Sequence, residues 1–473
     1  MSNVLLFLIS LSYSFYSMMS KDESKSIQES DANEIYILSQ LCNGLMLLFF
    51  FLSAPQIIIT LTGLLFLNPF NEKDVEPEFS SKDLPFVCIR IVTRGTYPNL
   101  VQRNVIKNME LIKSCGIKNF VVEVATDKPL YIEKYLKNYY QNYKETVVPT
   151  NYRSKFDARK KARALQYCLE KGINTLRNED YVIHLDEETL MTKEAMIGIV
   201  NFILKGKHTI GQGIITYGML PAPISNSFTL FQHHICTVAD SVRVSDDMGK
   251  NSAQFKLLHK PYFGMKGSYV VTKFEVEQDV TWDFGPEGSV AEDAWFGLRA
   301  IERGYTIDFI EGDMLEKSPF TFYDFIKQRQ RWMQGLFLVA YSSPMKWRTK
   351  MFLLMSVSAW MITPLFTLLF ILQKFILINP PGLIILIQRF LEVYIIYLQV
   401  VGYVRNFRST AQKYIFLLPN VLIGCLCNAV LENLATILAI KGLCSGSCYG
   451  FHVVQKDEFN SQEMEEKRKT KSS

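Results

Sequence analysis

The stretch Tyr181-Val-Ile-His-Leu-Asp-Glu-Glu188 decides the fold of this 473-residue chain. Its first five residues are apolar apart from one histidine, which is typical of a buried strand, and three carboxylates follow directly. Like charges at a strand end cost free energy unless a cation lies among them. Asp186 and Glu188 are oxygen ligands of the kind that Mg²⁺ or Mn²⁺ prefers, so the stretch predicts a metal site. An acidic helix N-terminus would give the same pattern.

Short apolar runs and helical patterns alternate around this strand. The expected strands and helices are, in chain order, 86–93, 99–115, 119–125, 130–143, 145–149, 156–171, 181–185 and 193–204. This alternation predicts βαβ units and an α/β fold, with a mostly parallel sheet covered on both faces. Ligands bind at the carboxyl ends of such strands, where Thr93, Arg94 and Asp127 also stand. The chain has no GxGxxG motif, so a dinucleotide-binding fold is not supported.

Composition excludes several classes of protein. Hydrophobic residues make up 48% of the chain and charged residues 21%, which excludes a disordered protein. The net charge of +5 arises from 51 basic and 46 acidic residues, so there is no general basic field to bind nucleic acid. The nine cysteines are scattered from Cys42 to Cys448 and do not form the dense framework of a secreted disulfide scaffold.

Long apolar segments flank a central polar block. Residues 44–67 carry no charge over 24 positions, which exceeds the roughly 20 residues needed to cross a bilayer. Residues 351–440 hold only seven charged residues and divide into about three further spans. The expected organisation is a membrane anchor region at 1–70 with a possible signal anchor at 4–19, a water-facing domain at 71–350, spans at 351–373, 383–403 and 414–440, and a polar tail at 441–473.

Basic residues near these spans predict their orientation. They are Lys346, Arg348 and Lys350 before the first C-terminal span, and Arg405, Arg408 and Lys413 two spans later. The positive-inside rule therefore predicts that the domain faces the cytosol. Three complete C-terminal spans would put the basic tail on the opposite side of the membrane. The sequence leaves this end open, because a re-entrant segment would reverse the side of the tail.

Two further motifs carry chemically useful side chains. Gly285-Pro-Glu-Gly-Ser-Val-Ala-Glu-Asp293 places Glu292 and Asp293 at the start of a predicted helix, where one carboxylate is a candidate general base and a helix-terminal charge pair is the alternative. Gln328-Arg-Gln-Arg-Trp332 lies on a predicted helix just before the membrane. Its arginines match phosphate oxygens and could stabilise a departing pyrophosphate, or they could simply be a basic flank of the membrane span.

Taken in order, these elements resemble those of a known family. Asp127, His184–Glu188, Glu292-Asp293 and Gln328–Trp332 resemble the nucleotide, D-x-D, T/S-E-D and Q-x-x-R-W elements of GT-A glycosyltransferases of family 2. The fuller text, with RIVTRG, HLDEET, GPEGSVAEDAWFG, QRQRWMQG and YGFHVV, is similar to the egghead family of invertebrate glycolipid β-1,4-mannosyltransferases over about residues 40–455. This chain departs from the pattern in having Glu188 for the second Asp, Ala291 for Thr or Ser, and Thr-Arg-Gly at the end of the first strand.

The resemblance implies an inverting enzyme of the endoplasmic reticulum or Golgi membrane. It would move mannose from GDP-mannose to the glucose of glucosylceramide in a β-1,4 linkage. Asp293 would be the catalytic base, and Asp186 and Glu188 would hold Mn²⁺ or Mg²⁺. The residues implied to contact the nucleotide sugar are Thr93, Arg94, Asp127, Lys161, Asp186, Gln328, Arg331 and Trp332.

Other functions fit parts of this pattern. A processive polysaccharide synthase of the cellulose, chitin or hyaluronan type shares the GT-A core, although three C-terminal spans are few for a polymer channel. A dolichyl-phosphate sugar synthase would need no sugar hydroxyl as its acceptor. A membrane scaffold or transporter could use Arg389 and Glu392 within a span as a relay, but would leave the ordered motifs unexplained. The sequence predicts no particular protein partner.

Overall fold

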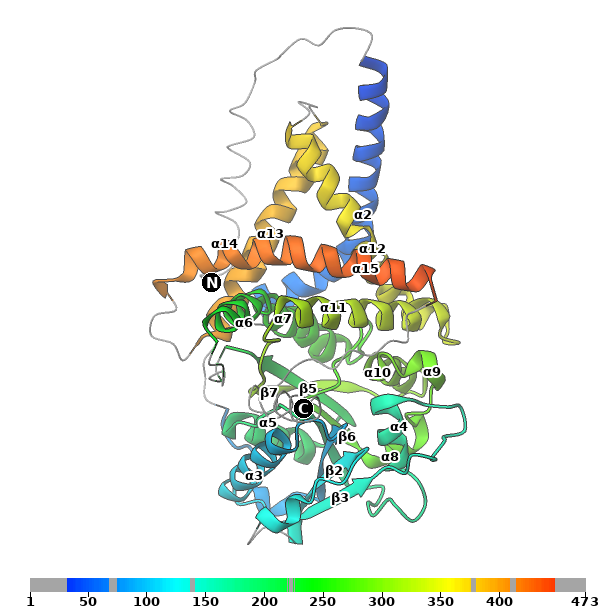
Figure 1. Cartoon of the computed structure of the whole chain (residues 1–473), viewed down its shortest axis with the longest axis vertical. Coiled ribbons are helices and arrows are strands. Elements are labelled where there is room, and N and C mark those ends of the chain that lie inside the picture. Colours follow the sequence, from blue (N-terminus) through cyan, green and yellow to red (C-terminus); the bar gives the residue numbers. More distant parts are fainter. Residues whose placement is uncertain are drawn as a thin grey trace, which may run out of the picture.

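A seven-stranded sheet forms the centre of the protein in this computed structural model, with the strand order β3-β2-β1-β4-β6-β5-β7 (Figure 1). The strands are β1 (Val87–Thr93), β2 (Phe120–Thr126), β3 (Tyr143–Val147), β4 (Tyr181–Asp186), β5 (Ile210–Thr216), β6 (Val270–Lys273) and β7 (Ile307–Leu315). All neighbours pair in parallel except β6, which is antiparallel to both β4 and β5. The predicted α/β class and mostly parallel sheet are confirmed.

The structure describes residues 32–67, 75–136, 141–218, 220, 224, 226–375, 380–408 and 414–446. The possible signal anchor at 4–19 and most of the polar tail lie outside the described residues.

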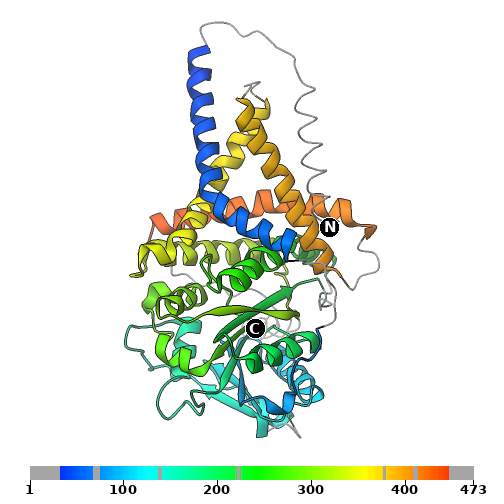
Figure 2. The same ribbon diagram turned by 180° about the vertical axis from the view of Figure 1, so that it is seen from behind.

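Helices cover both faces of the sheet. They are α3 (Pro98–Ser114), α4 (Lys160–Tyr167), α5 (Lys193–Lys205), α8 (Phe274–Val280), α9 (Gly285–Gly288) and α10 (Glu292–Glu302). Alternate residues of β1 show why both faces are occupied: Ile89 and Ile91 belong to the main hydrophobic core, whereas Cys88 packs with Phe274 of α8. Figures 1 and 2 show α3 and α5 on one side of the strands and α4, α8 and α10 on the other.

A buried ionic network lies on the α8 face of the sheet. Arg90 of β1 pairs with Glu123 of β2 through Nε at 2.8 Å and with Glu277 of α8 through Nη1 at 3.0 Å. His184 Nε2 lies 2.5 Å from the second oxygen of Glu277. Burial raises the pKa of each carboxyl group, but the neighbouring Arg90, His184 and Lys144 outweigh it and lower both pKa values to about 2. His184 in the decisive strand is therefore part of the core.

The segment between β2 and β3 differs from the expectation. The predicted helix at 130–143 is wrong: its described part contains no α-helix, and residues Ile132–Tyr135 form a short 3₁₀ helix. At the end of this segment strand pairing begins earlier than expected, with Tyr143 opposite Val122. Strand β3 therefore begins at residue 143 instead of 145 and ends at 147.

The predicted helix at 156–171 is also longer than the observed one. Helix α4 begins only at Lys160, because Asp157 and Lys160 have φ values of 61° and 54°, in the left-handed region. Asp283 holds this loop by accepting hydrogen bonds from the backbone N–H groups of Phe156 and Ala158 at 2.7 and 3.1 Å. The loop places two successive lysines at the beginning of α4.

Four helices in the described part of the chain are long and apolar enough to cross a membrane. They are Ser39–Phe66 within α2 (Ala32–Phe66), Trp347–Leu372 within α12 (Trp347–Phe375), Gly382–Asn406 (α13), and Leu417–Cys444, which comprises α14 (Leu417–Cys427), a π-helical segment (Asn428–Glu432) and α15 (Asn433–Cys444). Each coincides with a segment expected to span. Figure 1 shows α2, α12 and α13 extending from one end of the domain.

The end of α13 is fixed to the domain. Arg405 forms two hydrogen bonds to Asp313 of β7, with distances of 2.9 and 2.7 Å. The next residue, Asn406, donates to the carbonyl oxygen of Thr237 at 3.0 Å. A Cβ atom at Gly402 would lie 1.8 Å from the carbonyl oxygen of Ser241, so only glycine permits this close helix crossing. Helix α13 and the sheet therefore form one packed unit.

Candidate active site

A tight turn after β4 presents two carboxylates. The backbone N–H of Thr189 donates to the carbonyl oxygen of Asp186 at 3.0 Å and closes the turn. The middle carboxylate, Glu187, is buried and accepts a hydrogen bond from the Thr93 hydroxyl at the end of β1. Asn104 of α3 donates to the Glu187 carbonyl oxygen at 2.9 Å. Glu187 therefore fastens the turn, while Asp186 and Glu188 are half-buried at its edge.

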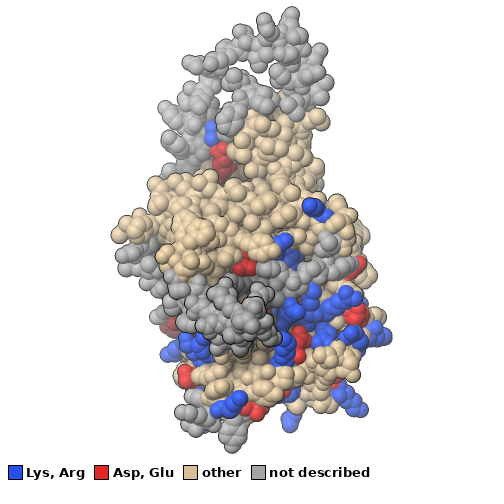
Figure 3. Space-filling model, in the orientation of Figure 1, with Lys and Arg blue, Asp and Glu red and all other residues tan. Residues whose placement is uncertain are grey.

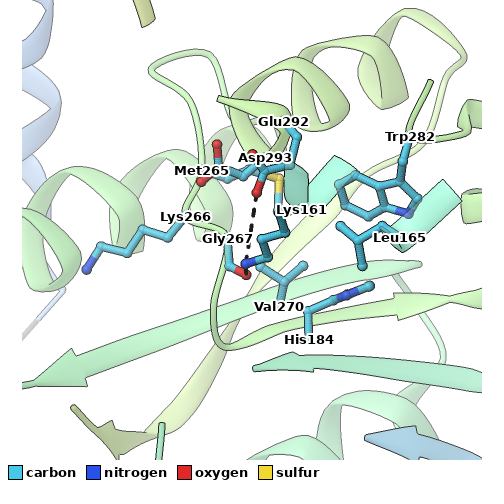
Figure 4. A pocket seen from close by; sticks show the side chains of 10 residues that line it. All are labelled: Lys161, Leu165, His184, Met265, Lys266, Gly267, Val270, Trp282, Glu292 and Asp293. Carbon is cyan, nitrogen blue, oxygen red and sulfur yellow. Dashed lines mark hydrogen bonds and ion pairs between the residues drawn. The ribbon is translucent and has the colours of Figure 1, made fainter. Parts of the chain in front are cut away.

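Lys161 lies among the carboxylates of the site. Its Nζ atom donates to Asp186 Oδ1 at 2.5 Å and to the carbonyl oxygen of Gly267 at 2.8 Å, and lies 3.9 Å from Glu292 Oε1 (Figure 4). Burial lowers the pKa of Lys161, but Asp186, Glu292 and Asp293 outweigh it and raise the pKa above its ordinary value. Lys161 therefore remains a cation at neutral pH, and its predicted contact with the diphosphate stays a prediction.

The first turn of α10 contributes the acidic pair. Burial and the neighbouring Asp293 raise the pKa of Glu292 to about 7, against the opposing effect of Lys161. Burial also raises the pKa of Asp293, although the N–H of Ala294 donates to it at 2.8 Å. A carboxylate with a raised pKa is a stronger proton acceptor, which suits a general base.

A small cavity of about 10 Å³ joins these groups. Its walls come from α4, β4, the loop before β6 and the beginning of α10 (Figure 4). The lining residues are Lys161, Leu165, His184, Met265, Lys266, Gly267, Val270, Trp282, Glu292 and Asp293. Carboxylates from two distant parts of the sequence therefore meet around one ammonium group.

Helix α11 (Phe322–Phe337) brings the third motif to this site. Arg331 Nη1 donates to the carbonyl oxygen of Val290 at 3.4 Å, and its positive charge lowers the pKa of the α10 carboxylates. Trp332 lies between two guanidinium groups, with Arg243 and Arg329 at 4.4 and 4.3 Å from the ring centre. Gln328 accepts a hydrogen bond from Arg329 at 3.0 Å. Arg331 thus joins the acidic cluster, while Gln328 and Trp332 pack against arginines.

The residues expected on the nucleotide side lie around α4. Asp127, after β2, accepts a hydrogen bond from Arg163 of α4 at 2.8 Å. Burial, together with the charges of Arg331 and Arg94, lowers the pKa of Lys160 to about 8. Arg94, Lys160 and Arg331 are therefore neighbours, and Figure 3 shows Lys and Arg side chains gathered on this face of the domain. Such a group of cations suits a diphosphate.

Sequence reasoning missed several residues of the site. Gly267 is the clearest case, because a Cβ atom there would lie 3.1 Å from both Asp293 Oδ2 and Lys161 Nζ. Ser268 also helps to position the site, because its hydroxyl accepts a hydrogen bond from the N–H of Asp186 at 3.2 Å. Both lie in the loop before the antiparallel strand β6. No motif spacing marks this loop, although its two close glycines, Gly264 and Gly267, hinted at a close backbone approach.

The carboxylates after β4 fit a divalent ion that binds together with a nucleotide. Asp186 and Glu188 offer hard oxygen ligands, and the side chain of Asp186 is 36% exposed. Within the described residues, no group of three or more His, Cys, Asp or Glu side chains has the arrangement of a metal cage. Mg²⁺ sites commonly consist of one or two carboxylates, with substrate phosphates and water completing the coordination. Two carboxylates beside a group of cations match that kind of site.

Comparison with known proteins agrees with this geometry. The profile of the glycosyl transferase family group 2 matches residues 181–410. Beta-1,4-mannosyltransferase egh of Drosophila melanogaster is 43% identical over 410 residues, covering 86% of this chain and 85% of that protein. Beta-1,4-mannosyltransferase bre-3 of Caenorhabditis elegans is 41% identical over 437 residues, covering 91% of this chain and 92% of that protein.

A solved structure, mannosyltransferase PcManGT from Pyrobaculum calidifontis in complex with GDP-Man and Mn²⁺, aligns with a TM-score of 0.45 and 12% identity, covering 85% of this chain and 99% of that chain. That likeness is too low to bear on the chemistry of this chain. The family match and the relatives above confirm the expected GT-A glycosyltransferase fold. With more than 40% identity to egh and bre-3 over most of its length, the chain is a glycosyltransferase that belongs to their β-1,4-mannosyltransferase family.

Proposed function

We propose that this enzyme transfers mannose from GDP-mannose to the glucose of glucosylceramide, forming a β-1,4 linkage with inversion at the anomeric carbon. The observation that carries the proposal is the meeting of Asp186 and Asp293 at the ammonium group of Lys161, which lines a small cavity together with Asp293, beside the arginine of α11. The family membership supports the transfer of mannose. The donor nucleotide and the lipid acceptor are the parts of the proposal that need direct tests.

Asp293 performs the proton transfer in this scheme. Its carboxylate accepts the proton of the acceptor hydroxyl, and the hydroxyl oxygen attacks the anomeric carbon from the side opposite the leaving diphosphate. The new C–O bond forms as the bond to the nucleotide breaks, so an α-linked donor gives a β-linked product. The raised pKa of Asp293 suits this role, because it makes the carboxylate a better base near neutral pH.

Cations at the site stabilise the departing diphosphate. Asp186 and Glu188 would hold a divalent ion, which when bound supplies positive charge next to the phosphate oxygens. Arg331, Lys160 and Arg94 add fixed positive charge on the same side. Lys161 keeps Asp186 oriented through its 2.5 Å hydrogen bond, and Asp127 with Arg163 would contact the base or ribose.

A membrane acceptor agrees with the position of the site. Helix α11, which carries Arg331, lies at the end of the domain from which α2, α12 and α13 extend (Figures 1 and 2). The glucosyl head group of a lipid would therefore approach Asp293 from the membrane side. The catalytic domain would face the cytosol of the endoplasmic reticulum or Golgi.

The proposal is tested with membranes that contain the enzyme. Labelled GDP-mannose, labelled UDP-glucose and labelled UDP-N-acetylglucosamine are added to them in separate reactions. We expect label only from GDP-mannose, in a lipid whose mass is that of glucosylceramide plus one hexose. Membranes with Asp293→Asn serve as the inactive control, and Arg177→Gln, at an exposed residue before the start of β4, serves as the matched active control. A ladder of products would indicate a processive synthase, and a labelled polyprenyl phosphate would indicate a dolichyl-phosphate type.

A further inference from the structure

We propose that the last apolar helix, Leu417–Cys444, lies flat on the membrane surface and does not cross the bilayer. The leucine-rich face of the helix enters the lipid, and the chain after it stays on the side of the catalytic domain. This inference concerns the membrane and goes beyond the proposed function. By length and hydropathy alone, this segment would be read as a fourth span.

The direction of the helix is the first observation. Figures 1 and 2 show α14 and α15 running across the ends of α2, α12 and α13, and nearly parallel to α11. Helix α14 packs on α6 (Ser227–Ala239), and α15 packs on α11. Its 28 residues extend about 42 Å at 1.5 Å per residue, so a crossing helix would carry one end far from the domain. The two halves of the helix instead contact α6 and α11 of the domain.

Polar side chains near the middle of the helix face the protein. Asn428 donates to the carbonyl oxygen of Ala239 in α6 at 3.3 Å, and Glu432 accepts from Arg329 Nε at 2.7 Å. Near the end of the helix, Gln334 of α11 donates to the carbonyl oxygen of Ala439 at 3.2 Å. Because α6 and α11 belong to the water-facing domain, these contacts hold positions 428, 432 and 439 at a similar distance from the bilayer. A helix that crossed the bilayer would place Glu432 near the middle of the hydrocarbon, which is costly.

The opposite face of the helix is a continuous apolar stripe. Leu418, Leu422, Leu426, Val430, Leu434 and Ile437 have 43–70% of their surface exposed and recur every three or four residues. That spacing places all six side chains on one side of a helix. Figure 3 shows an almost uncharged surface over this helix, with charged side chains gathered on the domain below it.

A lipid surface is the occupant that best fits this stripe. The stripe borders the three helices that leave the same end of the domain, so the membrane that receives those helices already lies against it (Figure 1). A helix that packs on the domain along one face and exposes apolar side chains along the other can lie in the interface, with the exposed face about 5–10 Å into the boundary between head groups and acyl chains. Three complete C-terminal spans would put the basic tail in the lumen, against the positive-inside rule. With a helix that lies on the membrane surface, the tail stays on the cytosolic side with the other basic residues.

The depth of the helix in the bilayer tests the proposal. A fluorescent amino acid would be introduced by amber suppression at position 418, 426 or 437 of the full chain, which would then be placed in phosphatidylcholine vesicles with doxyl groups at acyl carbon 5 or 14. We expect equal quenching at all three positions, with the shallow doxyl lipid the more effective. Positions 41 and 51 of α2 are matched exposed controls and should differ in depth by about 15 Å.

Three results would overturn the proposal. A spanning helix would show a depth difference of roughly 28 Å between positions 418 and 437. Quenching at α2 with none along the stripe would mean that a second copy of the chain or another protein covers it. The third result comes from a glycosylation acceptor appended to the C-terminus. We expect it to stay unmodified in microsomes and to be removed by added protease. Glycosylation of this acceptor would instead place the tail in the lumen. A failure of mannosyl transfer would leave these membrane measurements unaffected.

Discussion

The ammonium nitrogen of Lys161 lies 2.5 Å from Oδ1 of Asp186, so a fixed cation stands beside a carboxylate of the expected metal site. The same cation lowers the pKa of both carboxylates at the beginning of α10. One lysine therefore connects the proposed metal ligands with the proposed base.

Replacing Lys161 by methionine should shift the pH dependence of the reaction. Without the cation, the pKa of Asp293 rises further, so the base becomes protonated at a higher pH and activity is lost earlier on acidification. An opposite charge at this distance typically shifts a pKa by about 1–3 units. The acid limb of kcat/KM against pH should therefore move upward by at least about one unit. Lys161→Arg keeps the charge and should leave the limb near its original position; equal shifts in both variants would refute the electrostatic explanation.

Asp293→Asn should remove the base while preserving the fold, because the two side chains are nearly isosteric. General base catalysis contributes about 10²–10⁴-fold, and kcat should fall by that factor. Affinity for GDP-mannose should change little, since the base acts on the acceptor. Glu292→Gln is the neighbouring control and should reduce the rate less. If Asp293→Asn retained more than about a tenth of the activity, another group would have to be the base.

Glu188→Ala should weaken the metal-dependent binding of the donor. Loss of groups that support a metal site commonly costs about 10–100-fold in metal affinity, and we expect at least the lower figure for a direct ligand. The measurement is the Mn²⁺ concentration that gives half-maximal binding of GDP-mannose. Glu179→Gln, at an exposed ion pair before β4, is the control and should leave the Mn²⁺ requirement unchanged. Tight donor binding by an Asp186→Ala, Glu188→Ala double variant in EDTA would contradict the metal assignment.

Gly267→Ala should impair the reaction by crowding the site. The added methyl group would lie 3.1 Å from both Asp293 Oδ2 and Lys161 Nζ, which is closer than ordinary contact, so one side chain must move. We expect a lower kcat with an unchanged melting temperature. Gly382→Ala provides a control at the beginning of α13, where no atom lies within 4 Å of the added carbon. Full activity of Gly267→Ala would show that the site tolerates this displacement.

Acid should destabilise the domain through the buried network around Arg90. The pKa values of Glu123 and Glu277 are lowered from 4.5 to about 2, so their contribution to stability is complete above about pH 4.5 and is lost as the pH falls toward 2. Arg90→Met leaves two buried carboxylates without this partner and should cost about 3–5 kcal/mol. Thermal unfolding in detergent measures the change. Arg177→Met, at an exposed ion pair, should unfold like the parent protein.

Local sequence pattern was sufficient where a strand or helix is defined by its own residues. The apolar runs of β1 and β4 predicted those strands to within a residue. The direction of β4 then predicted that its carboxylates lie at the edge of the sheet where ligands bind. The start of α4 could not be predicted in the same way, because it depends on Asp283, which is more than 120 residues away in the sequence. The role of Glu187 was hidden for the same reason, since its partner, Thr93, lies on another strand.

The link between Arg405 and Asp313 has a mechanical consequence. A catalytic domain on a flexible tether samples many distances from the bilayer, and can reach acceptors of many lengths. Here the end of α13 is fastened directly to β7, so Asp293 stands at a constant height above the lipid. The proposed base would therefore act at one distance from the membrane: a lipid head group one sugar too long or too short would not reach it, even if its terminal sugar were the correct one.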